Sequence, residues 1–139
     1  MRMMKRTYSE LIKLPTFEER FEYLKLEPME RIDSLRKFRY LNQRFYSSNL
    51  WRSVRNKIII RDNGFDLGIP GYNISGRIQV HHLNPVTLEM LENNDPCLLD
   101  LENLISVSIK THEAITYSDE SLLPSYIIME RKPGDTKLW

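Results

Sequence analysis

The sequence predicts an α+β fold built as one domain, since 139 residues suffice for one core and not for two ordinary ones. Two observations indicate this class. In the first half, apolar residues recur at helical spacing, as Phe17, Phe21 and Leu24 do. In the second half, apolar and polar residues alternate over 77–83 and 105–110, which is typical of strands. We expect a helical part over 1–61, a strand–loop–strand–helix unit over 62–122, and a C-terminal strand and tail over 123–139.

Three helices are expected in the helical part. Thr16 and Glu19 have the spacing of a capping box, so a helix should cover 17–26 and end before Pro28. A second helix should cover roughly 31–46. A third should follow Ser47 and Ser48 and run to about residue 61, with Trp51 on its apolar side.

The second part begins with turns, because four of the five glycines fall between Gly64 and Gly76. The strand over 77–83 should stop at Asn84 and Pro85. A polar loop with a short helix near 88–91 follows, and then the strand over 105–110 and a short helix over 111–117. In the tail we expect a strand over 126–129 and a turn at 133–135.

Composition excludes several classes. The longest apolar stretches, 58–60 and 125–129, are too short to span a membrane. The basic N-terminus precedes an acidic amphipathic pattern, so no signal peptide is expected. Cys97 is the only cysteine, which excludes a disulfide framework and fits a reducing cytoplasm. We interpret Cys97 as a packing residue.

Charge is unevenly distributed although the net charge is only +1. Between Arg31 and Arg61 nine Lys or Arg stand against one acid, and between Pro85 and Leu122 eight acids stand against Lys110. A basic segment interleaved with aromatic residues can follow a phosphate backbone. It can also be a solvated helix face that pairs with the acidic half, and charge alone favours this second interpretation.

All three histidines lie in the second part: His81 and His82 end one strand, and His112 opens the helix after the next. A hairpin followed by a helix folds back, so the strand end can meet His112. Phosphodiester cleavage uses a cation to stabilise developing charge and a neutral imidazole to take a proton from water. One imidazole nitrogen cannot serve both purposes, so two adjacent histidines with different roles would suit this chemistry. The alternative is that the three histidines only cap or end their elements.

Residues 80–85, followed by Asn103 and then by His112 nine positions later, resemble the HNH nuclease motif. The resemblance implies a ββα-metal fold and metal-dependent hydrolysis of double-stranded DNA. It implies His81 and His112 as metal ligands and His82 as the general base. It further implies that Asn103 ties down the loop and orients His82.

Shorter segments widen this resemblance to nearly the whole chain. Residues 16–21, 39–43, 51–52, 61–64, 66–68 and 131–136 resemble parts of small HNH proteins of phages and prophages in Gram-positive bacteria. Phage DNA-packaging proteins are therefore expected among the partners, together with double-stranded DNA.

The chain departs from many HNH proteins in two ways. Where those proteins bind a structural zinc through two Cys-x-x-Cys pairs, this chain has Ser108 and Thr111, and Asp66 lies in the region of the first pair. No structural zinc is expected, so the helical half should brace the fold. Where colicin-type members have a third histidine ligand, this chain has Thr116. We therefore expect one divalent ion (Mg, Mn, Ni or Zn) on two protein ligands, with imidazole favouring the last three in affinity.

The residues chosen as candidate phosphate contacts are those cations that flank the motif, Arg61, Arg77 and Lys110. Asp62, Asp66 and the carboxylates from Glu89 to Glu102 are expected to be solvated or capping groups. Two other functions stay open: a DNA-binding or packaging accessory protein that kept the fold without activity, and a partner protein that uses the acidic region 85–122. The presence of both His82 and Asn103 favours the enzyme.

Overall fold

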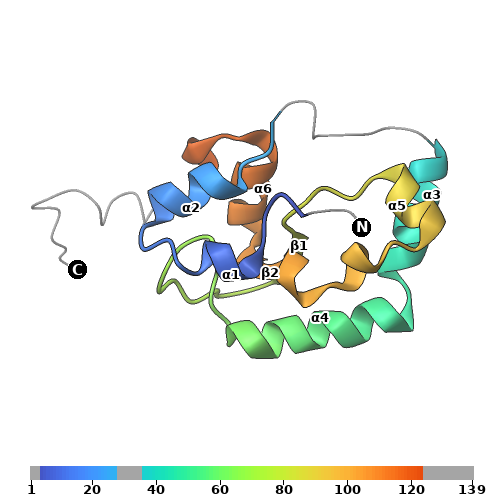
Figure 1. The fold of residues 1–139 in the computed structure, drawn as a ribbon. Helices are drawn as coiled ribbons and strands as arrows, with labels where there is room; N and C mark the ends of the chain where they lie inside the picture. Colours follow the sequence, from blue (N-terminus) through green and yellow to red (C-terminus); the bar gives the residue numbers. More distant parts are fainter. Residues whose placement is uncertain (1–3, 28–35, 124–139) are drawn as a thin grey trace, which may run out of the picture.

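The computed structural model describes residues 4–27 and 36–123. It is a mixed structure of helices around a two-stranded antiparallel sheet (Figure 1). The elements in chain order are α1 (Tyr8–Leu11), α2 (Phe17–Leu24), α3 (Arg36–Tyr46), α4 (Asn49–Asp62), β1 (Ile78–His82), α5 (Leu88–Asn93), the 3-10 turns η2 (Pro96–Leu99) and η3 (Leu101–Asn103), β2 (Leu104–Ser108), α6 (Ile109–Tyr117) and the 3-10 turn η4 (Glu120–Leu122).

Local capping chemistry sets the helix ends. The side chains of Thr16, Ser48 and Ser108 each accept a hydrogen bond from the backbone amide three residues later, and so begin α2, α4 and α6. Left-handed residues end α4 at Asn63 and α6 at Ser118. The predicted helices over 17–26 and after Ser48 are thus confirmed, each to within two residues.

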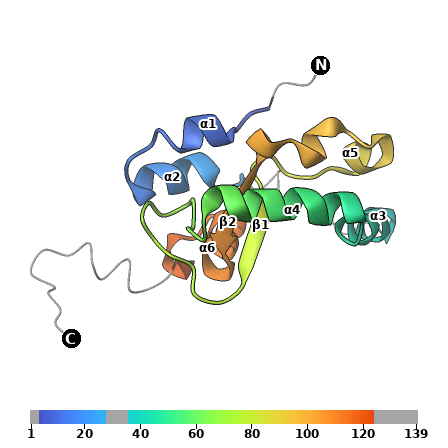
Figure 2. The same cartoon turned by 90° about the horizontal axis from the view of Figure 1, so that it is seen from below.

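Strands β1 and β2 pair in register from Ile78 with Ser108 to His82 with Leu104. One face of this sheet carries Val80 and Leu104, which pack on Trp51 and Ile58 of α4. The other face carries Ile105 and Val107, which pack on Leu11, Leu24 and Ile115 of α1, α2 and α6. The sheet therefore lies between α4 and α6, as Figure 2 shows from below.

The α3 helix extends this arrangement away from the sheet. Phe38, Leu41 and Phe45 pack against Met90 and Leu91 of α5, so α3 and α5 lie side by side (Figure 1). Within the described residues, no helix has the length and apolar character needed to cross a membrane.

Some expectations are corrected. The second strand ends at Ser108 and not at residue 110, because the Ser108 hydroxyl caps α6 and turns Ile109 into the first helical residue. Helix α1 was not predicted. The predicted start of the second helix at 31 and the tail strand over 126–129 lie outside the described residues.

Asp66 lies buried in the turn region between α4 and β1. Its carboxylate accepts hydrogen bonds from the Thr111 hydroxyl at 2.5 Å, the Ser108 amide at 3.1 Å and the Gly68 amide at 2.9 Å. A side chain at Gly68 would bring its Cβ within 2.8 Å of the Thr111 methyl carbon, so the close approach needs glycine. Asp66 thus ties the turn region to α6.

Asp66 and Asp62 are both buried and accept hydrogen bonds from backbone amides, so of the two expected roles, solvated or capping, the solvated one is wrong. Asp62 accepts from the Ser106 amide at 2.7 Å and pairs with Arg61. Buried carboxylates thus fasten the fold, one from α4 (Asp62) and one from the turn region (Asp66).

Candidate metal centre

His81 and His112 form an imidazole pair on the α6 side of the sheet. His81 comes from β1 and His112 from the first turn of α6, and their ring centroids are 5.1 Å apart at an interplanar angle of 76°. The His81 side chain is buried, and its Nε2 has no hydrogen-bond partner in the described residues. Burial of an imidazole nitrogen without a hydrogen-bond partner costs free energy, so a ligand bound at this atom would be stabilising.

Both imidazoles are held in the neutral form. Burial lowers the pKa of His81 well below its usual value, and the nearby His112, His82 and Arg6 charges lower it further. Burial also lowers the pKa of His112, and the Glu113 carboxylate partly opposes this shift. Neutral imidazoles have the free lone pairs that metal binding requires.

The pair fits a divalent ion as two of its ligands. Two imidazoles that share one ion through bonds of about 2 Å have ring centres at roughly the observed separation. The orphaned Nε2 of His81 is the observation that favours a ligand over an ordinary edge-to-face ring contact. Across residues 4–27 and 36–123, no three His, Cys, Asp or Glu side chains are grouped so as to hold a metal ion.

His82 lies on the opposite, α4-facing side of β1. Its ring stacks on Trp51 at 5.4 Å with an interplanar angle of 19°, and Phe45 and Tyr46 complete the aromatic enclosure. Its Nε2 lies 2.9 Å from the Leu98 carbonyl oxygen and its Nδ1 lies 3.0 Å from the Tyr46 hydroxyl. Both ring nitrogens therefore have partners.

These contacts define the tautomer of His82. A carbonyl oxygen only accepts, so Nε2 carries the proton and Nδ1 accepts a hydrogen bond from the Tyr46 hydroxyl. Burial lowers the pKa of His82 to about 4, and the bond to Leu98 partly opposes the shift. Burial also raises the pKa of Tyr46, which keeps its hydroxyl protonated and able to donate.

The structure does not bring all the predicted site residues together. His81 and His112 meet, but His82 is turned away because β1 stays regularly paired through His82, and neighbours in a strand point to opposite faces. A shared site would need the strand to twist or end there. In the described conformation His82 also has no free nitrogen to offer a water molecule.

Asn103 is fully buried and joins the loop to the strand end. Its Nδ2 donates to the Cys97 carbonyl at 3.0 Å, and its Oδ1 accepts from the backbone amide and side-chain Nδ2 of Asn84 at 2.9 and 2.7 Å. Cys97 is followed by Leu98, whose carbonyl accepts from His82. Asn103 thus fixes the loop that orients His82 without touching the imidazole.

Asn84 and Arg6 extend this clamp and were not singled out from the sequence. The backbone of Arg6 exchanges two hydrogen bonds with the Asn84 side chain, at 2.9 and 2.7 Å. The buried Arg6 guanidinium donates to the carbonyls of Tyr23, Lys25 and Leu83. The position of Asn84, close to the histidine pair and before a proline, is a sequence signal for its role in this clamp. Nothing local marks Arg6 among the basic N-terminal residues.

The three candidate phosphate contacts differ in availability. Arg77 and Lys110 are exposed. Arg61 pairs with Asp62, donates to the Leu101 and Leu104 carbonyls, and lies 3.6 Å over the Tyr8 ring. This arrangement does not agree with the prediction that Arg61 contacts phosphate, because its guanidinium forms these intramolecular contacts.

The basic segment is mostly unpaired with the acidic half. Of the described cations on α3 and α4, Lys37 forms an ion pair across to it, with Glu92 at 2.5 Å. Arg39, Arg44, Arg52 and Lys57 are exposed and form no ion pair with any described acid. The interpretation that these charges are neutralised within the domain therefore holds for Lys37 and not for the other four.

Comparison of this chain with protein-family models, with curated proteins and with solved structures found no match.

Proposed function

We propose that this protein is a metal-dependent endonuclease of the HNH type, which hydrolyses phosphodiester bonds in double-stranded DNA. The observation that carries the proposal is the neutral His81–His112 pair, with the unpartnered Nε2 of His81 beside the His112 ring. The order of β1, β2 and α6 around this pair is compatible with a ββα-metal unit.

His81 and His112 would hold one divalent ion, which is Mg, Mn, Ni or Zn. Such an ion stabilises negative charge on phosphate oxygens. The two-imidazole site leaves further positions for water and phosphate, so tight binding should need DNA as well. Asn103 would keep the loop around the site in one arrangement, as an outer-shell group does.

His82 stays the proposed general base, and its Nδ1 would be the accepting nitrogen. The Nε2–H bond to the Leu98 carbonyl fixes the tautomer that such a base needs. The proposal requires that the Tyr46 hydroxyl release Nδ1 and that the strand end turn toward the metal pair when DNA binds.

The second candidate is a catalytically inactive DNA-binding or phage-packaging accessory protein with the same fold. The enclosure of His82 by Trp51, Tyr46 and Phe45 favours it, because a protein that only binds needs no accessible base. Both candidates share the DNA partner and differ in turnover.

The deciding experiment incubates supercoiled plasmid with purified protein in Mg²⁺, Mn²⁺ or EDTA. We expect nicking or cutting that EDTA abolishes and that His112→Ala loses. Thr116→Ala is the matched control, since Thr116 follows one helical turn after His112 on α6 and should not coordinate the ion. Equal cleavage in chelator would refute the metal role. Salt-dependent DNA binding without cleavage would favour the accessory protein.

A further inference from the structure

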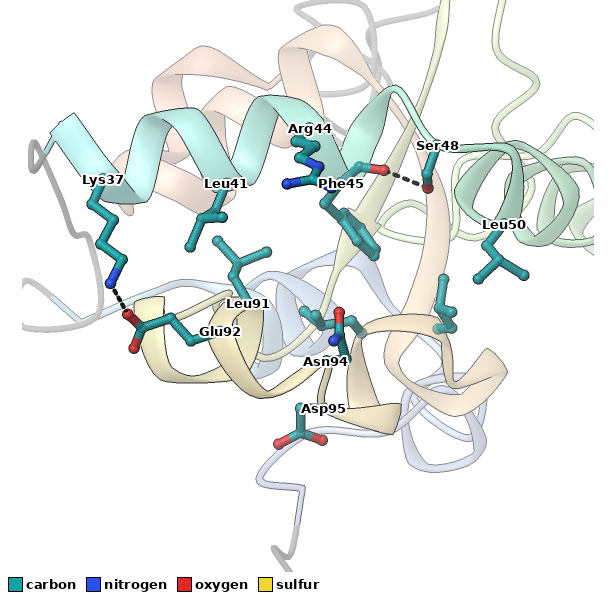
Figure 3. A pocket seen from close by; sticks show the side chains of 12 residues that line it. Lys37, Leu41, Arg44, Phe45, Ser48, Leu50, Leu91, Glu92, Asn94 and Asp95 are labelled. Atoms are coloured by element: carbon teal, nitrogen blue, oxygen red, sulfur yellow. Dashed lines mark hydrogen bonds and ion pairs between the residues drawn. The ribbon is translucent and has the colours of Figure 1, made fainter.

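A hollow of about 790 Å³ lies between α3, α5 and the segment 94–99, on the side of the sheet that His82 faces (Figure 3). Pockets of a few hundred to about 1,000 Å³ are the usual size for small ligands. The residues that line this pocket include Arg44, Phe45, Leu41, Leu91, Asn94 and Leu98.

This pocket shares a wall with the enclosure of His82. Phe45 lines the pocket, and its ring centroid is 6.1 Å from that of His82. Leu98 lines it as well, and its carbonyl accepts the hydrogen bond from His82 Nε2. A ligand in the pocket would therefore lie one side-chain layer from the imidazole that the motif assigns to catalysis.

The lining has an apolar middle between polar sides. Leu41 and Phe45 point from α3 toward Leu91 of α5, and these side chains form the apolar side of the pocket (Figure 3). One end is closed by the Lys37–Glu92 ion pair, whose two charges neutralise each other. Arg44 adds a guanidinium that has no ion pair with any described acid, and Asn94 adds an amide across from it. Asp95 lines the pocket too, and its carboxylate accepts a hydrogen bond from the Cys97 amide.

We propose that this pocket binds one nucleotide unit of a DNA strand, unstacked from its neighbours. Arg44 contacts the phosphate, because guanidinium binds phosphate oxygens in charge-assisted hydrogen bonds. The base lies against the apolar side chains of Leu41, Phe45 and Leu91, and the Asn94 amide forms hydrogen bonds with the polar edge of the base. The inference rests on the proposed function for the choice of DNA over an acidic peptide, and it adds a subsite that the motif does not contain.

The test uses the pentanucleotide (dT)5, in EDTA, with 15N-labelled full-length protein. We expect shift changes centred on the amides of Arg44, Asn94 and Leu98. Arg44→Gln should weaken binding by at least about tenfold, as loss of a charge-assisted contact does. Arg39→Gln is the matched control: the same charge change, on the same helix, at an exposed residue that does not line the pocket. It should change the dissociation constant by less than about twofold.

Several results would overturn the proposal: no binding of (dT)5, equal losses in the two variants, shifts away from the pocket amides, or the same shifts at the same affinity with inorganic phosphate alone. An acidic peptide that binds where (dT)5 does not would also overturn it. Failure of the proposed function looks different, because plasmid would stay intact in every metal while (dT)5 still bound with the expected variant pattern.

Discussion

His82 is the residue where motif and structure differ most. The motif assigns it a proton-transfer role, yet its ring is enclosed by Trp51, Tyr46 and Phe45 and both nitrogens are hydrogen-bonded. A neutral imidazole with one fixed tautomer is nevertheless the form that a general base needs. The Tyr46 hydroxyl occupies Nδ1 of His82, so it must leave before a reacting water can form a hydrogen bond there.

Tyr46→Phe tests that arrangement directly. Removal of the hydroxyl leaves Nδ1 of His82 buried without a donor, which typically costs about 1–3 kcal/mol of unfolding free energy. The Nε2–H tautomer should persist, because the Leu98 carbonyl still accepts from it. Urea unfolding measures the loss, and 15N shifts of the imidazole report the tautomer. Tyr40→Phe, at an exposed tyrosine of the same helix, should leave both unchanged.

If Tyr46→Phe left stability unchanged, or if the proton moved to Nδ1, the hydrogen-bond pair inferred for His82 would be wrong.

The residue order predicted the meeting of His81 and His112, because a hairpin followed by a helix returns the chain to the strand end. It could not predict the surroundings of His82. Those come from Tyr46 and Trp51, more than 30 residues earlier, whose packing on β1 is a tertiary contact without a local pattern.

At the scale of elements, the fold is fastened by buried carboxylates. Asp66 joins the turn region to the start of α6 through hydrogen bonds from Gly68, Ser108 and Thr111. Burial raises the pKa of Asp66, and the hydrogen bonds from Thr111, Ser108 and Gly68 oppose that shift. One buried carboxylate thus holds the turn region and the start of α6 together.

Asp66→Ala should therefore cost about 3 kcal/mol or more of unfolding free energy, since three donors lose their acceptor in the interior. Asp100→Ala is the control, because Asp100 is exposed and accepts one amide, from Glu102, so about 1 kcal/mol is expected. Urea unfolding in EDTA measures both losses, so that an ion on His81 and His112 does not contribute to them. Equal losses in the two variants would contradict the role of Asp66.

Element boundaries were predictable where the cue is local. Thr16 and Ser48 each cap their helix as the sequence indicates. The boundary between β2 and α6 was missed because Ile105, Val107 and Ile109 continue the alternation of a strand. The Ser108 cap decides the outcome, and Ile109 is left on the surface.

For the whole molecule, the buried histidines make stability depend on pH. The pKa of His82 is lowered to about 4, against about 6.5 in an unfolded chain, so the unfolded state binds more protons between these values. The contribution of His82 to the free energy of unfolding is therefore fully present above pH 6.5 and is lost as pH falls toward 4. This contribution is about 3 kcal/mol, and the pKa values of His81 and His112 are lowered as well.

Urea unfolding in EDTA at pH 7.5 and pH 4.5 measures this loss. His82→Gln should be less stable than the wild type at pH 7.5 but should lose about 3 kcal/mol less on acidification. The same pH dependence in both proteins would mean that His82 is not buried in its neutral form.

His81 and His112 are proposed to share one divalent ion, which His82 does not bind. The test is calorimetric titration with Mn²⁺ of the wild type, His81→Ala, His112→Ala and His82→Ala. The wild type should bind one ion, with low affinity in the absence of DNA. The His81 and His112 variants should each lose most of the affinity, and His82→Ala should keep it nearly unchanged. Loss of binding in His82→Ala with retention in His81→Ala would contradict the assignment, and an affinity equal in all four proteins would contradict the metal centre itself.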